Sequence, residues 1–578
     1  MRSRTTAAPM LACAAVLLAA CSNTPPPPVV SSSASPVSTS TTKTPSQVVV
    51  GVDDVLGGYN PHNLADASQV TSALSQLLLP SVFRPKDDGS FELDKSLMKS
   101  AEVVSQQPFT VAYTIRPDAS WSDSAPIAAE DFAYLREAMR DQPGVIGAAG
   151  YRLISDIQSR EGGKRVEVTF SKPYPGWQTL FGNLLPAHLL KDAPNGWQGA
   201  LATAFPAVGG PYSIKGLDTA RGEITLERNE RYWEKPSALD RIVLRAADQE
   251  GTLAALRSGN DQFAMTRTDG TGLKRLGELG SAVQLHTVAR PTVAQILLRP
   301  VSSTLSDPKV REGVTALIDR GKLITEATDG GPSDKLRADA QVRVPSAPGF
   351  QPTIPAPGPP SAADPVKGEE LLKSAGYTKE AGTWRKNGKN LSLVVASPAK
   401  QEPYATIAKE LTAQLVAAGI EVNAIAPQPR ELFSTLLAMP VLNGIQQTTP
   451  EGAGNVGIDI AVIGQVTGGA DVASALASSF GCRPDQLTEK TKAVVPANPL
   501  GFCDPALQPS IDAALTGATP AADALSALEP ELWRRNVAIP LFQLADTLAI
   551  GSGISGVTAG PPMVGPFGSA VNWTRGPK

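Results

Sequence analysis

The sequence contains few of the residues from which metal and catalytic sites are usually built. Only three histidines occur in 578 residues, His62, His188 and His286, and they lie far apart. A zinc site would need histidine, cysteine or carboxylate ligands at close motif spacing, and the sequence has none. GxSxG, HExxH and P-loop motifs are also missing. We therefore expect no metal, no cofactor and no enzymatic activity, and an exported enzyme is the least favoured hypothesis.

The sequence has no excess of charge of either sign. Its 52 Lys and Arg residues oppose 55 Asp and Glu residues, for a net charge of −3 at pH 7. Because nucleic-acid-binding proteins usually have a clear basic surplus, we expect no nucleic-acid partner. With 42% hydrophobic and 19% charged residues, the composition is that of a globular protein. The length is enough for several domains of roughly 100–200 residues each.

The amino-terminal segment has the pattern of an export signal. Two arginines precede an apolar run at 7–20, which is too short to span a bilayer that needs about 20 helical residues. The run ends in LAAC at 18–21, which resembles the bacterial lipobox, whose cysteine is lipidated before cleavage. We expect a signal peptide at 1–20 and a lipid on Cys21 that anchors the exported protein at the outer face of the cell membrane. A plain signal peptide is the alternative.

Residues 21–46 are rich in proline, serine and threonine. Four consecutive prolines are followed by small polar residues that offer almost nothing to bury, so folding cannot offset the entropy of ordering the segment. We predict a flexible tether that holds the folded body away from the membrane.

Two cysteines remain in the body of the chain, Cys482 and Cys503. An exported protein folds in an oxidising compartment, and closing a loop of this size would stabilise it by roughly 3 kcal/mol. We therefore predict a structural disulfide. The alternative, a redox or metal pair, has no CxxC spacing or nearby histidine to support it.

Residues 209–233 combine a hairpin pattern with residues typical of a family. Apolar and polar residues alternate at 212–217 and again at 223–228, which predicts an antiparallel hairpin. With Gly-Pro-Tyr at its entrance and Tyr-Trp after it, the stretch resembles the family 5 extracellular solute-binding proteins, the receptors of peptide and nickel ABC transporters. Further stretches resemble the same family in the same order along the chain: 121–132, 307–324, 364–377 and 539–543.

The alternation of helix and strand patterns in the second half of the chain favours an α/β fold with helices covering a sheet. The family resemblance implies more, namely a periplasmic-binding-protein-like fold of class C, with an extra domain and two lobes joined by a hinge. On that basis we predict three domains after the tether. Domain I comprises 47–88, 206–290 and 546–578, domain II comprises 89–205, and domain III comprises 291–545.

One feature of the peptide-binding members is missing. They usually carry a tryptophan and an acidic segment after a strand of the third domain, and the carboxylate holds the ammonium group of the peptide. In the corresponding run at 458–480, Gly464, Gln465 and Thr467 are among the residues that replace them. Because a buried ammonium without an opposing charge is costly, we do not expect capture of free peptide amino ends. Asp471 would supply the charge if the alignment shifts.

The resemblance also implies candidate residues at the ligand cleft. The loop after the first strand contributes Tyr59, Asn60 and His62, and the third-domain strand contributes Gln465 and Thr467. The alternative hypothesis, that all five are ordinary loop and turn residues, stays open.

Two functions fit this scaffold. The chain resembles in particular mycobacterial lipoproteins of this fold that are linked to phosphatidylinositol mannoside and lipoarabinomannan synthesis, which implies a regulatory or lipid-glycan-binding factor. Its partners would be the membrane, through the lipid anchor, and a mannosylated lipid or a membrane mannosyltransferase. The alternative is a substrate-binding lipoprotein that closes over a peptide or another small solute and delivers it to an ABC permease. We favour the first hypothesis and expect a monomer.

Overall fold

The structure is a computed structural model, and it describes residues 46–55, 58–448, 456–467, 469, 471–489 and 491–576. All of these belong to the unit that runs from Pro45 to Lys578. The predicted signal peptide at 1–20, the lipidated Cys21 and the tether up to residue 45 lie outside the described residues.

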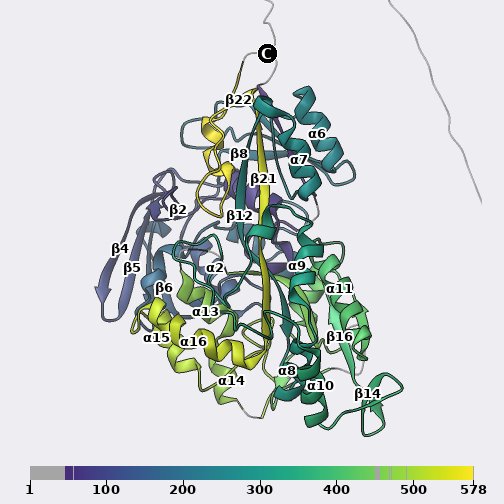
Figure 1. The fold of residues 1–578 in the computed structure, drawn as a ribbon. Helices are drawn as coiled ribbons and strands as arrows, with labels where there is room; N and C mark the ends of the chain where they lie inside the picture. Colours follow the sequence, from purple (N-terminus) through teal and green to yellow (C-terminus); the bar gives the residue numbers. More distant parts are fainter. Residues whose placement is uncertain are drawn as a thin grey trace, which may run out of the picture. The chain divides into compact units, whose positions relative to one another are not determined.

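A ten-stranded sheet connects the two halves of the described chain (Figure 1). Its spatial order is β17-β16-β20-β12-β21-β11-β1-β10-β9-β8. The pairs β1–β10, β1–β11, β16–β17 and β16–β20 are parallel, and the others are antiparallel. The strands are β1 (Gln47–Val52), β8 (Tyr212–Asp218), β9 (Glu223–Arg228), β10 (Arg241–Ala246), β11 (Phe263–Thr266), β12 (Val283–Leu298), β16 (Ser392–Ala396), β17 (Glu421–Ile425), β20 (Ile460–Val466) and β21 (Ala538–Gly551).

Two strands of this sheet, β12 and β21, have 16 and 14 residues and run side by side (Figure 1). Their antiparallel pairing is irregular between Ala289 and Gln295. On one side of the irregularity β21 also pairs with β11, and on the other side β12 also pairs with β20. The boundaries predicted at 290/291 and 545/546 fall inside these strands, close to the irregularity. The division into three domains stays a prediction.

The predicted hairpin is confirmed, because β8 and β9 pair antiparallel. Close packing explains a glycine at its entrance: a Cβ on Gly210 would lie 2.3 Å from the carbonyl oxygen of Leu77, near the end of helix α1. The Gly210 amide instead donates a hydrogen bond to the Leu78 carbonyl at 2.9 Å. The hairpin therefore fixes one end of α1. Nearby elements are η1 (Leu64–Asp66), α1 (Gln69–Leu78), α6 (Gln249–Ser258), α7 (Gly270–Gly277), η4 (Gly280–Ala282), β22 (Ile554–Ser555), η7 (Pro566–Asn572) and β23 (Thr574–Arg575).

A second, four-stranded antiparallel sheet has the order β4-β5-β7-β6. Helix α2 packs on it and buries Phe132 and Leu135. Asp131 caps α2 by accepting hydrogen bonds from the amides of Ala128 at 2.9 Å and Ala187 at 3.0 Å. The elements are β2 (Phe83–Pro85), β3 (Phe91–Leu93), β4 (Met98–Gln106), β5 (Phe109–Ile115), α2 (Ala129–Asp141), α3 (Ala149–Arg152), β6 (Ile154–Arg160), η2 (Glu161–Gly163), β7 (Arg165–Phe170), η3 (Pro175–Thr179), α4 (Ala187–Leu190) and α5 (Gly196–Gly199).

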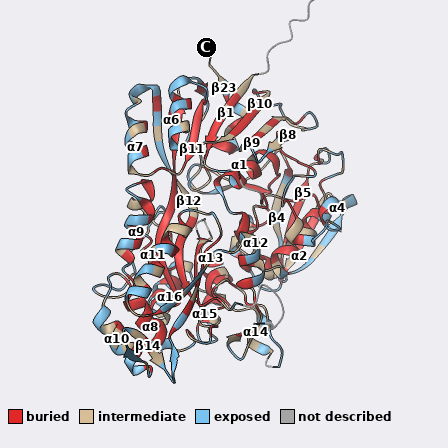
Figure 2. Cartoon of the chain, turned by 90° about the vertical axis from the view of Figure 1, so that its right-hand side faces the viewer, coloured by how far each residue is buried: buried red, intermediate tan, exposed pale blue. Residues whose placement is uncertain are grey.

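Helices cover the end of the large sheet that β16, β17 and β20 form, and their inner faces are buried (Figure 2). The stretch 307–324 forms two helices, and Asp319 caps the second by accepting a hydrogen bond from the Lys322 amide at 3.0 Å. The elements are α8 (Pro308–Ala316), α9 (Arg320–Thr328), η5 (Pro332–Lys335), α10 (Pro365–Ser374), β13 (Thr378–Glu380), β14 (Thr383–Lys386), β15 (Lys389–Asn390) and α11 (Tyr404–Ala417).

Cys482 and Cys503 form the predicted disulfide, with their Cα atoms 4.8 Å apart. The bond lies among the short helices that precede β21. Within the described ranges, no helix combines the length and the apolar character that crossing a bilayer requires. The elements of this part are α12 (Pro429–Glu431), η6 (Leu432–Leu436), β18 (Val441–Leu442), β19 (Ile445–Gln446), α13 (Val472–Phe480), α14 (Pro484–Thr488), α15 (Gln508–Leu515) and α16 (Ala521–Arg535).

Candidate functional site

A cavity of about 560 Å³ lies where the long strands, α1 and the carboxyl-terminal segment meet. Its volume falls within the range of roughly 300–1,000 Å³ that is usual for ligand pockets. The end of β1, the residues around β11 and α1 line it from segments that the sequence assigns to domain I. The end of β20 and the start of α11 line it from predicted domain III. A bound ligand would therefore contact both.

One part of the cavity wall is apolar. Its members come from β11, β12 and the carboxyl-terminal segment, and they pack around one glycine. A Cβ built on Gly565 would lie 3.2 Å from Met265 Cε and 3.9 Å from Val288 Cγ1. We call this surface the apolar wall, and it consists of Met265, Val288, Met563, Val564 and Phe567.

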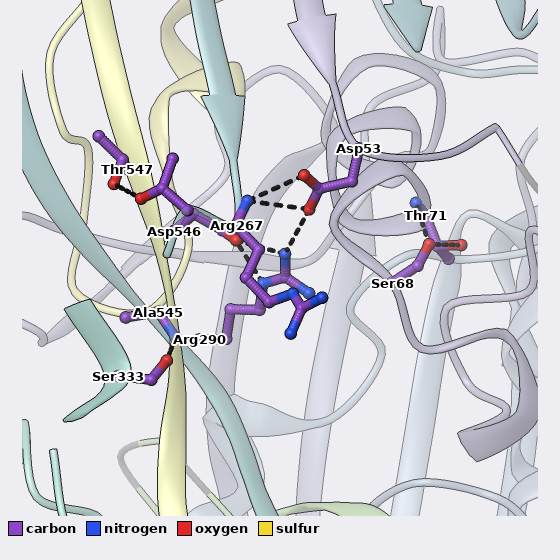
Figure 3. A network of polar contacts seen from close by, with 10 residues as sticks. Asp53, Ser68, Thr71, Arg267, Arg290, Ser333, Ala545, Asp546 and Thr547 are labelled. Atoms are coloured by element: carbon purple, nitrogen blue, oxygen red, sulfur yellow. Dashed lines mark hydrogen bonds and ion pairs between the residues drawn. The ribbon is translucent and has the colours of Figure 1, made fainter. Parts of the chain in front are cut away.

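An ion-pair network forms another part of the wall (Figure 3). Arg290, on β12, donates from Nε to Asp546 Oδ2 at 2.7 Å and makes a second, short hydrogen bond to the same carboxylate. Arg290 Nη2 also lies 3.4 Å from Asp53 Oδ2. Asp53 in turn accepts hydrogen bonds from the Arg267 amide at 2.9 and 3.0 Å. Because Asp546 lies on β21, the network joins both long strands to the end of β1.

Burial changes the protonation of this network. It raises the pKa of Asp53 to about 6, with a further contribution from the charge of Asp546, while Arg290 and the Arg267 amide act in the opposite direction. For Arg290, burial alone would lower the pKa. The two carboxylates outweigh that effect, so its pKa is raised and it stays charged. Near neutral pH the network therefore contains a permanent cation and one carboxylate that titrates.

Several charges on the wall have no partner. Arg267, Lys400 and Asp54 line the cavity, and none of their side chains forms a hydrogen bond or ion pair with a residue that the structure describes. Burial raises the pKa of Asp54. The wall therefore offers open groups of both signs. Its full set of charged residues is Asp53, Asp54, Asp248, Arg267, Arg290, Lys400, Glu402 and Asp546.

The three residues predicted from the first loop lie behind the cavity wall. Tyr59 and Asn60 are fully buried, and His62 is 8% exposed. His62 Nε2–H donates to the Asn183 carbonyl at 2.9 Å. Burial lowers the pKa of His62 to about 4, so the ring is neutral at physiological pH. In this loop it is Pro61 that lines the cavity.

The two residues predicted from the third-domain strand also lie off the wall of the large cavity. Gln465, on β20, donates a hydrogen bond to a serine of α13 at 3.4 Å, and the Thr467 amide donates to the Pro291 carbonyl at 3.0 Å. Val466, between them, lines the cavity, because alternate residues of a strand face opposite sides. Both predicted segments thus reach the cavity through a neighbouring residue, and a ligand role for the five predicted residues stays a prediction.

Polar contacts join segments that the sequence assigns to different domains. Arg430, on α12, donates from Nε to Asp66 Oδ1 at 3.1 Å. The Tyr174 hydroxyl donates to Asp471 Oδ2 at 2.6 Å, and Asp471 also caps α13 by accepting from the Ser474 amide at 2.9 Å. Asp471, the possible substitute for the peptide clamp, is therefore committed to structural contacts.

The charged wall residues are not among the five predicted cleft residues, although the sequence contains a signal for some of them. Asp53 and Asp54 directly follow an apolar strand, and Asp546 is the one charged residue in the buried strand β21. A charge in a buried strand needs a partner. The sequence does not show that the partner is Arg290, which lies 256 positions away.

The family model for bacterial extracellular solute-binding proteins, family 5 (middle part), matches residues 92–486. The chain belongs to this family. It is accordingly a binding protein and not an enzyme. A relative from Mycobacterium tuberculosis (strain ATCC 25618 / H37Rv), named probable monoacyl phosphatidylinositol tetramannoside-binding protein LpqW, is 33% identical over 623 residues. The alignment covers 94% of each of the two proteins.

Solved structures of the family share the fold. A periplasmic EDTA-binding protein, EppA, is 22% identical, with a TM-score of 0.69 over 92% of this chain and 97% of its own. The oligopeptide-binding protein AppA from Bacillus subtilis, solved with a nonapeptide, is 17% identical, with a TM-score of 0.70 over 92% of this chain and 100% of its own. The α/β, periplasmic-binding-protein-like fold with two lobes is thereby confirmed.

Proposed function

We propose that this family 5 protein binds an acylated, mannosylated phosphoinositide in the cavity between its lobes. It would act as a regulatory or glycolipid-binding factor in phosphatidylinositol mannoside and lipoarabinomannan synthesis. The name of the LpqW relative supports this ligand class. The observation that carries the proposal is that the apolar wall and a wall of open polar groups share one cavity of about 560 Å³. An acyl chain needs the first, and sugar hydroxyls and a phosphate need the second.

A buried amide on the cavity wall supports a ligand with hydroxyl groups. Gln69, at the amino end of α1, lines the cavity and is 6% exposed. Neither its amide nitrogen nor its amide oxygen has a hydrogen-bond partner in the described part of the chain. Buried polar atoms are normally paired. A sugar or inositol hydroxyl both donates and accepts, so it suits an amide in which both functions are open.

The proposed location follows from the amino-terminal sequence. A lipid on Cys21 and a tether at 21–46 would hold the cavity near the outer face of the membrane, where glycolipid intermediates are accessible. A membrane mannosyltransferase is the protein partner that this arrangement favours.

Native mass spectrometry of the full chain, purified from its own membranes in mild detergent, tests the ligand. We expect a bound species whose extracted lipid contains mannose, phosphate and fatty acid. The regulatory role is tested by deleting the gene, which should change phosphatidylinositol mannoside and lipoarabinomannan levels and leave solute uptake unchanged. A protein that copurifies with no lipid, and that added mannosylated lipid does not stabilise against heat, would refute the ligand assignment.

A receptor for an ABC importer is the second candidate function. It is favoured by the open carboxylate of Asp54 and by Glu402 on the cavity wall, since either could oppose the ammonium of a peptide. These carboxylates come from segments other than the third-domain strand, where peptide-binding members carry theirs. Micromolar binding of an unmodified oligopeptide, lost in Asp54→Asn, would favour this function over the first.

A further inference from the structure

Two hydrogen-bond donors on the cavity wall, the guanidinium of Arg267 and the hydroxyl of Tyr404, have no partner among the described residues. Arg267 directly follows β11, and Tyr404 is the first residue of α11. Both line the cavity. Because polar groups in enclosed positions are normally hydrogen-bonded, two open donors on one wall point to a ligand that accepts hydrogen bonds.

Tyr404 is held in place by its surroundings. It is 8% exposed, and burial raises its pKa to about 12, so it is a protonated donor at neutral pH. The positive charges of Arg290 and Arg267, which line the same cavity, oppose that rise. A Cβ on Gly464 would lie 2.1 Å from Tyr404 Oη. The glycine on β20 therefore leaves the space that the hydroxyl occupies.

Arg267 differs from its neighbour Arg290 in what balances its charge. In Figure 3 the guanidinium of Arg290 is joined by dashed lines to Asp53 and Asp546, whereas the lines at Arg267 end on its backbone amide. The carboxylates of Asp53 and Asp546 are thus bonded to Arg290 and to that amide. The side chain of Arg267 remains a cation that is free to bind an anion.

Anion binding by Arg267 and Tyr404 depends on these two residues and not on the net charge of the cavity. Five carboxylates and three cations line the whole cavity, so its total charge does not attract anions. Selectivity must come from directed donors, and an arginine fork and a phenol hydroxyl that line one cavity are suited to the oxygens of one oxyanion. The acids elsewhere on the wall, such as Asp54, can accept hydrogen bonds from ligand hydroxyls.

We propose that Arg267 and Tyr404 form an oxyanion subsite, and that in the lipid of the proposed function, on which this inference rests, they bind the phosphate between headgroup and glycerol. Met265 lies two residues before Arg267 and belongs to the apolar wall. Both residues line the same cavity, so the acyl chain of a lipid whose phosphate binds Arg267 can extend over the apolar wall.

Calorimetric titration of the full chain with two soluble amphiphiles tests the subsite: lysophosphatidylinositol, which carries a phosphodiester, and a neutral alkyl mannoside of equal chain length. Arg267→Gln should weaken binding of the lysophosphatidylinositol by about 10- to 100-fold, because a hydrogen bond to a charged group is lost. Binding of the alkyl mannoside should change less than about twofold. Tyr404→Phe should also weaken binding of lysophosphatidylinositol, by a smaller factor than Arg267→Gln. Arg267→Lys should retain part of the affinity for this ligand.

Arg257→Gln is the matched control, since it removes an equal charge from an exposed position on α6 and should change neither titration. The subsite assignment would be overturned if Arg267→Gln weakened the binding of both amphiphiles equally. It would also be overturned if this variant bound lysophosphatidylinositol as tightly as the wild type. If the wild type binds neither amphiphile, the proposed function fails but the subsite is still tested with inorganic phosphate. Phosphate should then raise the melting temperature of the wild type more than that of Arg267→Gln, and equal responses would overturn the inference.

Discussion

Removing one partner of the ion pair between Arg290 and Asp546 should strongly destabilise the unit that contains the cavity. Asp546 has no exposed side-chain surface and Arg290 has 20%. In Asp546→Asn the arginine keeps only one carboxylate, Asp53, at 3.4 Å. Removing one partner of a buried ion pair costs about 3–5 kcal/mol, because the other charge remains buried. Since Asp53 remains, we expect about 3 kcal/mol less unfolding free energy.

Urea unfolding followed by tryptophan fluorescence measures this loss as a shift of the midpoint. Asp118→Asn is the matched control, because it removes a carboxylate 2.7 Å from Arg116 in a pair that is 48% and 30% exposed. An exposed pair of this kind contributes less than about 1 kcal/mol. If the two variants lose equal amounts, the Arg290–Asp546 pair is not the buried, strongly coupled contact described above.

A double variant separates the loss of a contact from the presence of an unpaired charge. Arg290→Met combined with Asp546→Leu removes both charges and keeps apolar volume in their place. Buried pairs replaced in this way are often neutral or more stable. We therefore expect the double variant to recover most of the stability that Asp546→Asn loses. A double variant as unstable as the single one would show that packing, and not the unpaired charge, causes the loss.

Three further predictions follow from the same contacts. Because the pKa of Asp53 is raised from 3.8 to about 6, its contribution to stability is complete below about pH 3.8 and is lost as the pH rises through about 6. The unfolding free energy of the wild type should thus fall relative to Asp53→Asn across that window, and parallel pH profiles would contradict this. Serine at both Cys482 and Cys503 should cost roughly 3 kcal/mol in urea unfolding under oxidising conditions; reducing agent should affect only the wild type. Gly464→Ala should displace the Tyr404 hydroxyl and abolish its contribution to phosphate binding, so the variant should titrate lysophosphatidylinositol like Tyr404→Phe.

Local patterns in the sequence predict much of the fold. The alternation at 212–217 and 223–228 predicts β8 and β9, and the family-like stretch at 539–543 lies in β21. The stretch at 307–324 shows the limit of such patterns. Its apolar spacing indicates helix, but the spacing alone does not show that the Asp319 side chain caps a second helix there. A capping residue and a solvent-facing acid cannot be told apart by spacing alone.

The cavity is less predictable, because its wall comes from segments that are distant in sequence. The loop and strand predicted to reach it do so, but through Pro61 and Val466 and not through their polar neighbours. Which residue of an alternating pair faces the ligand depends on strand register, and a shift of one residue reverses the answer. The partners of a buried acid such as Asp546 depend on β12–β21 pairing, which no local motif encodes.

The position of the proposed oxyanion subsite links ligand binding to the arrangement of the lobes. Arg267 lies in a segment assigned to domain I and Tyr404 in one assigned to domain III, so one phosphate can bond both only when the two are held together. The Arg430–Asp66 contact joins the same two predicted domains without ligand. A ligand shifts an equilibrium only by its difference in affinity for the two states. A neutral ligand that touches one lobe would leave the equilibrium unchanged, whereas a phosphate bonded to both residues favours the arrangement in which Arg267 and Tyr404 are held together.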